Sequence, residues 1–227
     1  MNKLILISGC SGGGKSTLLS IIGLLDTATS GEYEISDVAV TSLTPSQMAK
    51  VRNKEIGFIF QDFNLIGDMT VWENAVLERL RTPEFSRRGF VRQGAARAYT
   101  NDLIKRFDIR GAAPDTRIRL LSGGNMQKLI LGRVLSNGPR FVLANQPTRG
   151  LDEGAIAAVH AELLAARAEG AAILLISEEL EEAVALSDRI QAIVKGRLSD
   201  PISADEADPQ RLGLMMAGVW TEDENAA

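Results

Sequence analysis

A glycine-rich segment near the N-terminus limits the folds open to this chain more than any other stretch. Residues 4–25 read LILISGCSGGGKSTLLSIIGLL, an apolar run, a glycine-rich turn and a second apolar run. The segment from Gly9 to Ser16 fits the spacing G-x-x-x-x-G-K-[ST], in which backbone N–H groups wrap closely around phosphates. A helix beginning near Lys15 would direct its free N–H groups at the anion. The pattern predicts a strand, a phosphate-binding loop and a helix; the alternative is a turn that only connects strand to helix.

The chemistry expected of this loop depends on two side chains. Lys15 would reach the β- and γ-phosphates of a nucleotide, and the hydroxyl of Ser16 would bind Mg²⁺. Cys10 is interpreted as a small loop residue, with a redox role as the alternative. The residues expected to contact the nucleotide here are Gly9, Cys10, Ser11, Gly12, Gly13, Gly14, Lys15, Ser16 and Thr17.

The composition excludes several classes of protein. A chain of 227 residues, 45% of them hydrophobic, can bury one substantial core, which fits a single domain with or without a subdomain. The formal net charge of −4 argues against general affinity for nucleic acid. The single cysteine excludes an internal disulfide and fits a reducing compartment. No apolar run is long enough to span a bilayer, and the LILI run before Cys10 is too short for a lipoprotein signal.

Patterns along the rest of the chain predict alternating strands and helices. FVLANQ and AAILLIS are continuous apolar runs, typical of parallel strands that are covered on both faces. TPSQMAKVRNKE carries the start signals of a helix, with Thr44 as its N-cap. EGAIAAVHAELLAARAEG predicts a helix with one apolar face. IQAIVKGRL predicts a hairpin that turns at Lys195 and Gly196.

A basic stretch interrupts the helical pattern of residues 72–110. It reads RTPEFSRRGFVRQGAAR and contains the helix breakers Pro83, Gly89 and Gly94. The plain interpretation is a solvated loop in a helical insert. The alternative is a surface that docks a partner.

Four motifs occur in an informative order along the chain. They are the phosphate loop, Gln61 after FIF, LSGGN at 121–125 and QPTRGLD at 146–152. In this order they resemble the nucleotide-binding domain of an ATP-binding-cassette (ABC) transporter, and the resemblance covers nearly the whole chain. It implies an α/β P-loop NTPase fold with a mostly parallel sheet core flanked by helices.

The resemblance also implies a domain organisation. We expect one nucleotide-binding domain over residues 1–220, with a helical subdomain at about 70–135, and a disordered acidic tail at 221–227. Family members carry an antiparallel β region upstream of the phosphate loop, with an aromatic residue that stacks on adenine. Neither is found in this sequence, so we expect ATP to bind less tightly, since stacking on a base contributes about 1–3 kcal/mol in nucleic-acid complexes.

The two halves of the chain resemble different branches of the family. Residues 30–75 resemble lipoprotein-release and macrolide-export ATPases, whereas the chain from RTPEFSRRGF onward resembles the second cassette of nucleoside and simple-sugar importers. The change falls at about residues 70–82. A recombinant or artificial chimera is one explanation, and natural divergence is the other.

The family mechanism gives the LSGG segment a role. Two cassettes pair head to tail, and each ATP lies between one phosphate loop and the partner's LSGG segment. This implies that Ser122, Gly123, Gly124 and Asn125 contact the partner's ATP through a hydroxyl, backbone N–H groups and a helix N-terminus. The loop from Arg149 to Asp152 would communicate between the two sites. The alternatives are an ordinary N-cap and turn for LSGG and an N-cap role for Asp152.

Three positions depart from the catalytic pattern of the family. Asn145 stands where the magnesium-linked Asp is expected, Gln146 where the catalytic Glu is expected, and Glu178 where the switch His is expected. A neutral Gln cannot accept a proton from water as a carboxylate does, and general base catalysis contributes about 10²–10⁴ in rate. We therefore expect slow turnover or none. Gln61 would contact Mg²⁺ and the attacking water, with a polar strand end as its alternative, so the magnesium ligands expected are Ser16, Gln61 and Asn145.

The function implied by the resemblance is that of an ATP-binding subunit of a transporter, which binds ATP and Mg²⁺. Its expected partners are a second cassette and an integral membrane permease, at the cytoplasmic face of the cell membrane. The resemblance of the C-terminal half favours import of nucleosides or sugars. Two alternatives stay open: a non-hydrolysing ATP-gated binding or regulatory module, and a truncated or chimeric cassette without function.

Overall fold

The structure is a computed structural model that describes residues 4–60 and 64–220. It divides into two compact units. Unit 1 gathers the described residues of 1–58, 139–146 and 166–227, and unit 2 those of 59–138 and 147–165. Two sequence predictions, the role of Gln61 and the acidic tail at 221–227, lie outside the described residues.

A mostly parallel sheet organises unit 1. Its strand order is β10-β9-β1-β8-β7-β4, and β11 also pairs with β9. Strands β1, β7, β8 and β9 pair in parallel, whereas β10 and β11 run antiparallel to β9. The strands of the sheet are β1 (Leu4–Ser8), β4 (Ile56–Phe60), β7 (Phe141–Asn145), β8 (Ala172–Ile176), β9 (Arg189–Val194), β10 (Arg197–Leu198) and β11 (Ile202–Ser203).

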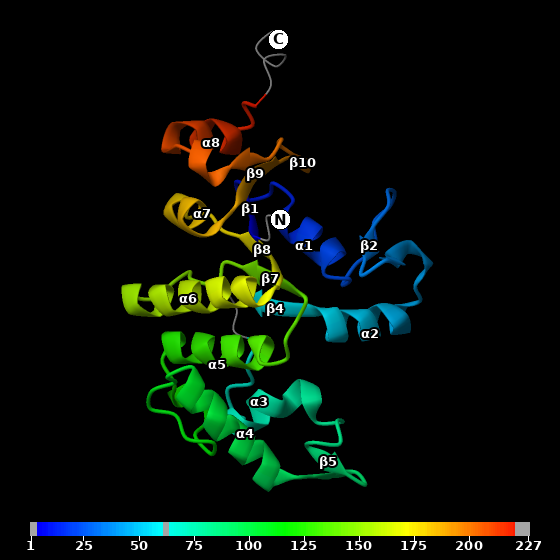
Figure 1. Cartoon of the computed structure of the whole chain (residues 1–227), viewed down its shortest axis with the longest axis vertical. Coiled ribbons are helices and arrows are strands. Elements are labelled where there is room, and N and C mark those ends of the chain that lie inside the picture. Colours follow the sequence, from blue (N-terminus) through cyan, green and yellow to red (C-terminus); the bar gives the residue numbers. More distant parts are fainter. Residues whose placement is uncertain (1–3, 61–63, 221–227) are drawn as a thin grey trace. The chain divides into compact units, whose positions relative to one another are not determined.

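The central strands are buried along almost their whole length. Leu4, Leu6, Leu143 and Leu175 have no exposed surface, as expected where helices cover both faces of a parallel sheet. Figure 1 shows helices α1 and α7 on opposite sides of β1. The predicted parallel sheet core flanked by helices is therefore confirmed.

Helix α2 (Pro45–Glu55) begins at its predicted signals. In α2, Thr44 and Gln47 form a reciprocal capping box, and Pro45 occupies the first helical position. This arrangement satisfies backbone donors that the first turn of a helix leaves unpaired. The helices are α1 (Lys15–Ile22), α2 (Pro45–Glu55), α7 (Leu180–Leu186) and α8 (Pro209–Met216), with short 3₁₀ turns η1 (Val40–Ser42) and η4 (Ala204–Glu206). A longer helix, α6 (Glu153–Glu169), begins in unit 2 and ends in unit 1.

Two hairpins of unit 1 turn through residues with positive φ. The hairpin between β9 and β10 turns at Lys195 (φ 49°) and Gly196 (φ 77°), as predicted. A second hairpin, β2 (Glu34–Ile35) with β3 (Val38–Ala39), turns at two residues with φ between 50° and 62°. Two consecutive positive φ angles match the right-handed twist of the flanking strands.

Unit 2 is mainly helical. Its helices pack around a buried cluster of Trp72, Val76, Phe85 and Ala96. The elements that lie wholly in this unit are α3 (Val71–Val76), η2 (Leu77–Arg79), β5 (Ser86–Arg87), β6 (Phe90–Val91), α4 (Gln93–Arg106), η3 (Ile118–Leu120) and α5 (Gly123–Leu135).

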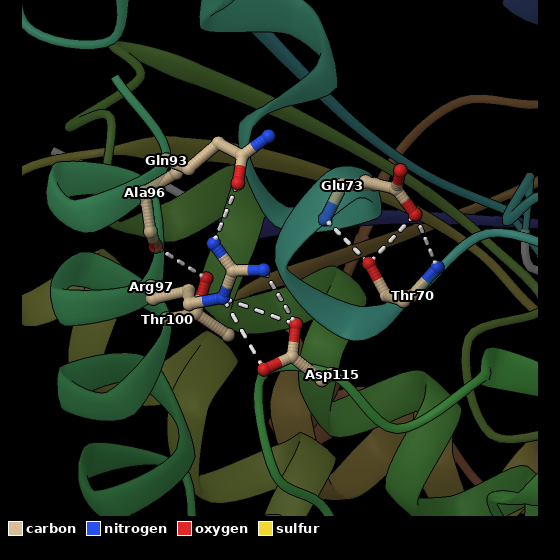
Figure 2. A network of polar contacts seen from close by, with 7 residues as sticks. All are labelled: Thr70, Glu73, Gln93, Ala96, Arg97, Thr100 and Asp115. Carbon is tan, nitrogen blue, oxygen red and sulfur yellow. Dashed lines mark hydrogen bonds and ion pairs between the residues drawn. The ribbon is translucent and has the colours of Figure 1, made fainter. Parts of the chain in front are cut away.

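Polar contacts cap α3 and link α4 to the loop that follows it (Figure 2). Thr70 caps α3 through its hydroxyl, and the Glu73 carboxylate accepts from the Thr70 backbone N–H at 2.7 Å. Arg97 of α4 donates to the Asp115 carboxylate at 2.8 Å. The hydrogen bonds from Thr70 hold the pKa of the Glu73 carboxyl below its ordinary value.

The basic stretch differs from the predicted solvated loop. Residues 86–91 form the hairpin β5–β6, which turns at Arg88 (φ 52°) and Gly89 (φ 84°). Gly89 breaks a helix, but in the left-handed region it also suits a two-residue hairpin turn. Phe90 at this turn is 80% exposed. Docking of a partner by this hairpin stays a prediction.

Candidate functional site

The predicted phosphate loop lies between β1 and α1 and has the expected backbone. Gly12 and Gly14 have φ angles of 79° and 105°, and Gly14 is the N-cap of α1. The Gly13 N–H donates to the Cys10 carbonyl at 3.1 Å, which closes a tight turn. Glycine adopts these positive φ angles without the clash of a Cβ atom. No side chain caps α1, so its first turn offers N–H groups to an anion.

Two other glycines are required by packing. A Cβ atom at Gly13 would lie 2.6 Å from the carbonyl oxygen of Ile193, and one at Gly9 would lie closer still. The Gly13 carbonyl also accepts from the Gly196 N–H at 2.9 Å. The phosphate loop therefore packs directly against the backbone of β9 and of the turn between β9 and β10. The sequence predicted positive φ angles and phosphate contact for the loop glycines, but not this packing.

The ammonium group of Lys15 donates hydrogen bonds to the backbone of the phosphate loop. Its Nζ donates to the carbonyl oxygens of Gly9 and Cys10, the latter at 2.9 Å. The same Nζ lies 3.1 Å from Oε1 of Glu178, and the two side chains are 13% and 42% exposed. Of the other candidates, Ser16 and Thr17 are exposed on the first turn of α1. The ion pair with Glu178 was not predicted.

Cys10 is exposed beside the C-terminal helix. Its Sγ lies 3.5 Å from the carbonyl oxygen of Met216, and Oγ of the neighbouring Ser8 lies 3.6 Å from Sδ of Met216. The last residues of α8 therefore pack against the start of the phosphate loop. Cys10 thus lies in the loop, and its contact with a nucleotide stays a prediction.

The carboxyl ends of three parallel strands bring the other candidates to the same edge of the sheet. Ile176, the last residue of β8, pairs in register with Ile7 of β1 and with Asn145 of β7. Glu178 follows β8 and reaches Lys15. Asn145, at the end of β7, is half-buried. The edge therefore presents a lysine, a carboxylate and an amide at positions that the sequence assigned to nucleotide chemistry.

Gln146 has an unusual backbone conformation. Its φ angle is 52°, it is 8% exposed, and its N–H donates to the Ile176 carbonyl at 2.8 Å. A non-glycine residue in the left-handed region carries strain, which is concentrated at functional sites. The position expected to carry the catalytic base is therefore held in a fixed and costly conformation.

The LSGG segment forms the start of α5 in unit 2. Ser122 is the N-cap, but its side chain does not cap the helix; its Oγ instead accepts from Nδ2 of Asn125 at 2.9 Å. Oδ1 of Asn125 accepts from the Arg110 N–H at 2.8 Å. A Cβ atom at Gly124 would lie 3.0 Å from Cβ of Ala155, so glycine allows close packing here. Gly123 is the first residue of the helix.

Asp152 caps α6. Its Oδ1 accepts from the Ala155 N–H at 2.9 Å, and its carbonyl accepts from the Ile156 N–H at 2.9 Å. The alternative interpretation of Asp152 as an N-cap is therefore confirmed, and its role in communication stays a prediction.

The donors available for magnesium are weak by themselves. Over residues 4–60 and 64–220, no group of three or more His, Cys, Asp or Glu side chains could hold a metal ion. Ser16 offers a hydroxyl and Asn145 a neutral amide oxygen. Because Mg²⁺ is commonly bound by one or two protein groups together with substrate phosphates, these donors fit an ion that arrives with a nucleotide. Such an ion would supply positive charge beside the phosphates.

Comparison with known proteins agrees with this arrangement. The family model described as "ABC transporter" matches residues 1–149. The dimeric, post-hydrolysis structure of the ATP-binding cassette MJ0796 bound to ADP and Pi superposes with a TM-score of 0.76 at 30% identity, over 89% of this chain and 85% of that one. The chain therefore belongs to the ABC transporter family, as an ATP-binding domain of the ATPase class.

Two relatives are import ATP-binding proteins by name. The guanosine import ATP-binding protein NupO of Bacillus subtilis is 38% identical over 99% of this chain and 44% of its own length. The nucleoside import ATP-binding protein NupA of Lactococcus lactis is 34% identical over 95% of this chain and 43% of its own length. The chain thus spans less than half of these relatives. In the part of the chain that the structure describes, no helix is both long and apolar enough to cross a bilayer.

Proposed function

We propose that this chain is the ATP-binding part of an ABC importer of nucleosides or sugars. The names of the relatives from Bacillus subtilis and Lactococcus lactis support this substrate class. In this proposal residues 1–220 form the cassette, and the helical part at about 70–135 is its helical subdomain. The helical elements of unit 2 support that assignment.

The proposed ligand is MgATP, held at the phosphate loop. The observation that carries this proposal is the position of Lys15 at the start of α1, with its ammonium group directed across the loop backbone. Backbone N–H groups of residues 9–17 would hold the phosphates, and Lys15 would exchange its carbonyl partners for phosphate oxygens. Ser16 and Asn145 would hold magnesium, with Gln61 as a further ligand.

We propose that hydrolysis at this site is slow. Asn145 and Gln146 follow the buried β7 with amides in place of carboxylates. Neither amide can take a proton from the attacking water, and general base catalysis contributes about 10²–10⁴ in rate. Glu178, at the position of the switch residue, adds negative charge beside Lys15. The chain would then act as an ATP-dependent clamp more than as the principal hydrolase.

Productive turnover would need partners. Ser122, Gly123, Gly124 and Asn125 begin α5 without a side-chain cap, which suits contact with an ATP held by a second cassette. The dimeric cassette MJ0796, which has a similar fold, supports a dimer of this kind by analogy. A membrane permease would be the second partner, which places the chain at the cytoplasmic face of the membrane.

A calorimetric titration with MgATP tests this function. The wild-type chain should bind, Lys15→Ala should not, and Lys50→Ala, which removes an exposed lysine of α2, should bind like the wild type. Absence of binding by the folded wild-type chain would contradict the proposal.

A non-hydrolysing regulatory module is the second candidate, favoured by the same three substituted positions. Stable ATP-dependent dimers in the absence of a permease and of turnover would favour it over the importer. Measurement of the molar mass in solution with and without MgATP makes that distinction.

A further inference from the structure

The carboxylate of Glu178 occupies a place on Lys15 that a phosphate would need. A lysine ammonium has three donors. Here two are directed at the carbonyl oxygens of Gly9 and Cys10, and Glu178 lies 3.1 Å away as the third neighbour. A nucleotide phosphate that binds Lys15 must therefore displace at least one of these three partners.

The three partners are not equivalent. The two carbonyls are neutral and belong to the loop that surrounds the α- and β-phosphates, whereas Lys15 extends to the β- and γ-phosphates. Glu178 approaches from the end of β8, outside that loop, and carries a negative charge. Its carboxylate therefore competes for the ammonium group with the outermost phosphate that Lys15 would bind.

We propose that Glu178 sets the nucleotide preference of this site, favouring ADP over ATP relative to the same site with a neutral side chain. The proposal rests on nucleotide binding at the phosphate loop, as set out above. ADP can use Lys15 through its β-phosphate while Glu178 stays in place. ATP must either displace the Glu178 carboxylate from Lys15 or bind with its γ-phosphate repelled by that carboxylate.

The surroundings of Glu178 allow displacement at a cost. Its side chain is 42% exposed, so it can turn toward solvent. Its backbone is fixed between the buried Ser177 and α7, where the Glu179 N–H donates to Oγ of Ser177 at 3.1 Å. The carboxylate therefore stays near the loop even when it leaves Lys15. A unit charge a few ångströms from a phosphate changes affinity by roughly fivefold in well-hydrated surroundings.

The test compares the affinities of ATP and ADP, measured by calorimetry with Mg²⁺ present, in the wild-type chain, Glu178→Gln and Glu181→Gln. The control removes the same charge from an exposed residue on the first turn of α7. Glu178→Gln should raise the affinity for ATP relative to ADP by about fivefold, while Glu181→Gln should leave the ratio unchanged. A thermal melt without nucleotide checks that each variant folds.

Each outcome decides between the two proposals. An unchanged ratio in Glu178→Gln, with both nucleotides bound, overturns this inference and leaves nucleotide binding intact. A fall in ATP affinity on Glu178→Gln also overturns it, because the carboxylate would then assist magnesium or phosphate binding. If neither nucleotide binds to the wild type or to Glu178→Gln, nucleotide binding at the loop is itself wrong. A rise of about fivefold in the affinity for ATP relative to ADP, with both nucleotides bound by the wild type, supports the inference.

Discussion

The backbone N–H of Gln146 donates to the carbonyl oxygen of Ile176 at 2.8 Å, while Gln146 itself adopts a φ angle of 52°. The hydrogen bond joins the residue after β7 to the last residue of β8. It helps to hold the backbone of Gln146, the position expected for the catalytic base, in the left-handed region. Residues other than glycine, asparagine and aspartate are strained in that region.

This conformation predicts a difference between two substitutions at position 146. Gln146→Val should lower the free energy of unfolding by about 1–2 kcal/mol, because β-branched residues are poorly tolerated at positive φ. Gln146→Asn should cost less, since asparagine enters this region more readily. Chemical denaturation of both variants measures the difference, and equal stability would contradict the backbone conformation described here.

The glycines of the phosphate loop should differ in their tolerance of alanine. In Gly12→Ala the added Cβ atom has no neighbour within 4 Å, but the φ angle of 79° is unfavourable for alanine. This substitution should lower the free energy of unfolding by about 1–2 kcal/mol. Gly9→Ala meets the backbone of Ile193 and should cost more, with loss of nucleotide binding. Gly213→Ala, inside α8 and in open space, is the control and should stabilise by about 0.5–1 kcal/mol. Urea denaturation would refute the packing argument if Gly9→Ala were the mildest of the three.

Alanine substitutions at Ser122 and Asp152 should have different effects on the free energy of unfolding and on association with a second cassette. Asp152→Ala removes a cap of α6 and should cost about 0.5–2 kcal/mol. Ser122→Ala removes no side-chain cap, so its effect on unfolding should be smaller, while ATP-dependent association with a second cassette should weaken. Denaturation and light scattering test the pair. A large loss of stability in Ser122→Ala would show that its hydroxyl is structural.

The capping box of α3 should give the fold a dependence on pH. Hydrogen bonds from Thr70 hold the pKa of Glu73 below its ordinary value of 4.5. The folded state therefore gains stability from Glu73 above pH 4.5, and this gain is lost as the pH falls through the lowered pKa. Thr70→Ala should cost about 1 kcal/mol at neutral pH, with a smaller difference in acid. Denaturation across this pH range gives the test, and a difference independent of pH would exclude the Glu73 contribution.

Local signals in the sequence predicted the elements that local chemistry determines. Thr44 and Gln47 cap α2 as expected, and Lys195 and Gly196 turn the hairpin between β9 and β10. The glycine spacing of residues 9–16 also predicted the turn between β1 and α1. In each case the residues that make the structure are neighbours along the chain.

Contacts between distant segments were not predictable in the same way. Lys15 and Glu178 meet only because β1 and β8 pair in register, and Gly13 is confined by Ile193 of the next strand. The basic stretch was interpreted as a loop because Pro83, Gly89 and Gly94 break helices. Gly89 with Arg88 also suits a hairpin turn. Pairing of strands and packing of loops depend on the whole fold, which one sequence pattern does not encode.

The two amides that follow β7, at Asn145 and Gln146, are the proposed cause of slow hydrolysis at this site. Phosphate release at saturating MgATP should be compared in the wild-type chain, in Asn145→Asp combined with Gln146→Glu, and in Gln210→Glu, an exposed control that makes one of the two amide-to-carboxylate changes away from the site. The wild type should bind MgATP with turnover near background, and the double variant should gain about 10²-fold or more. Turnover in the wild type equal to that of the double variant, with nucleotide bound to both, would contradict the account.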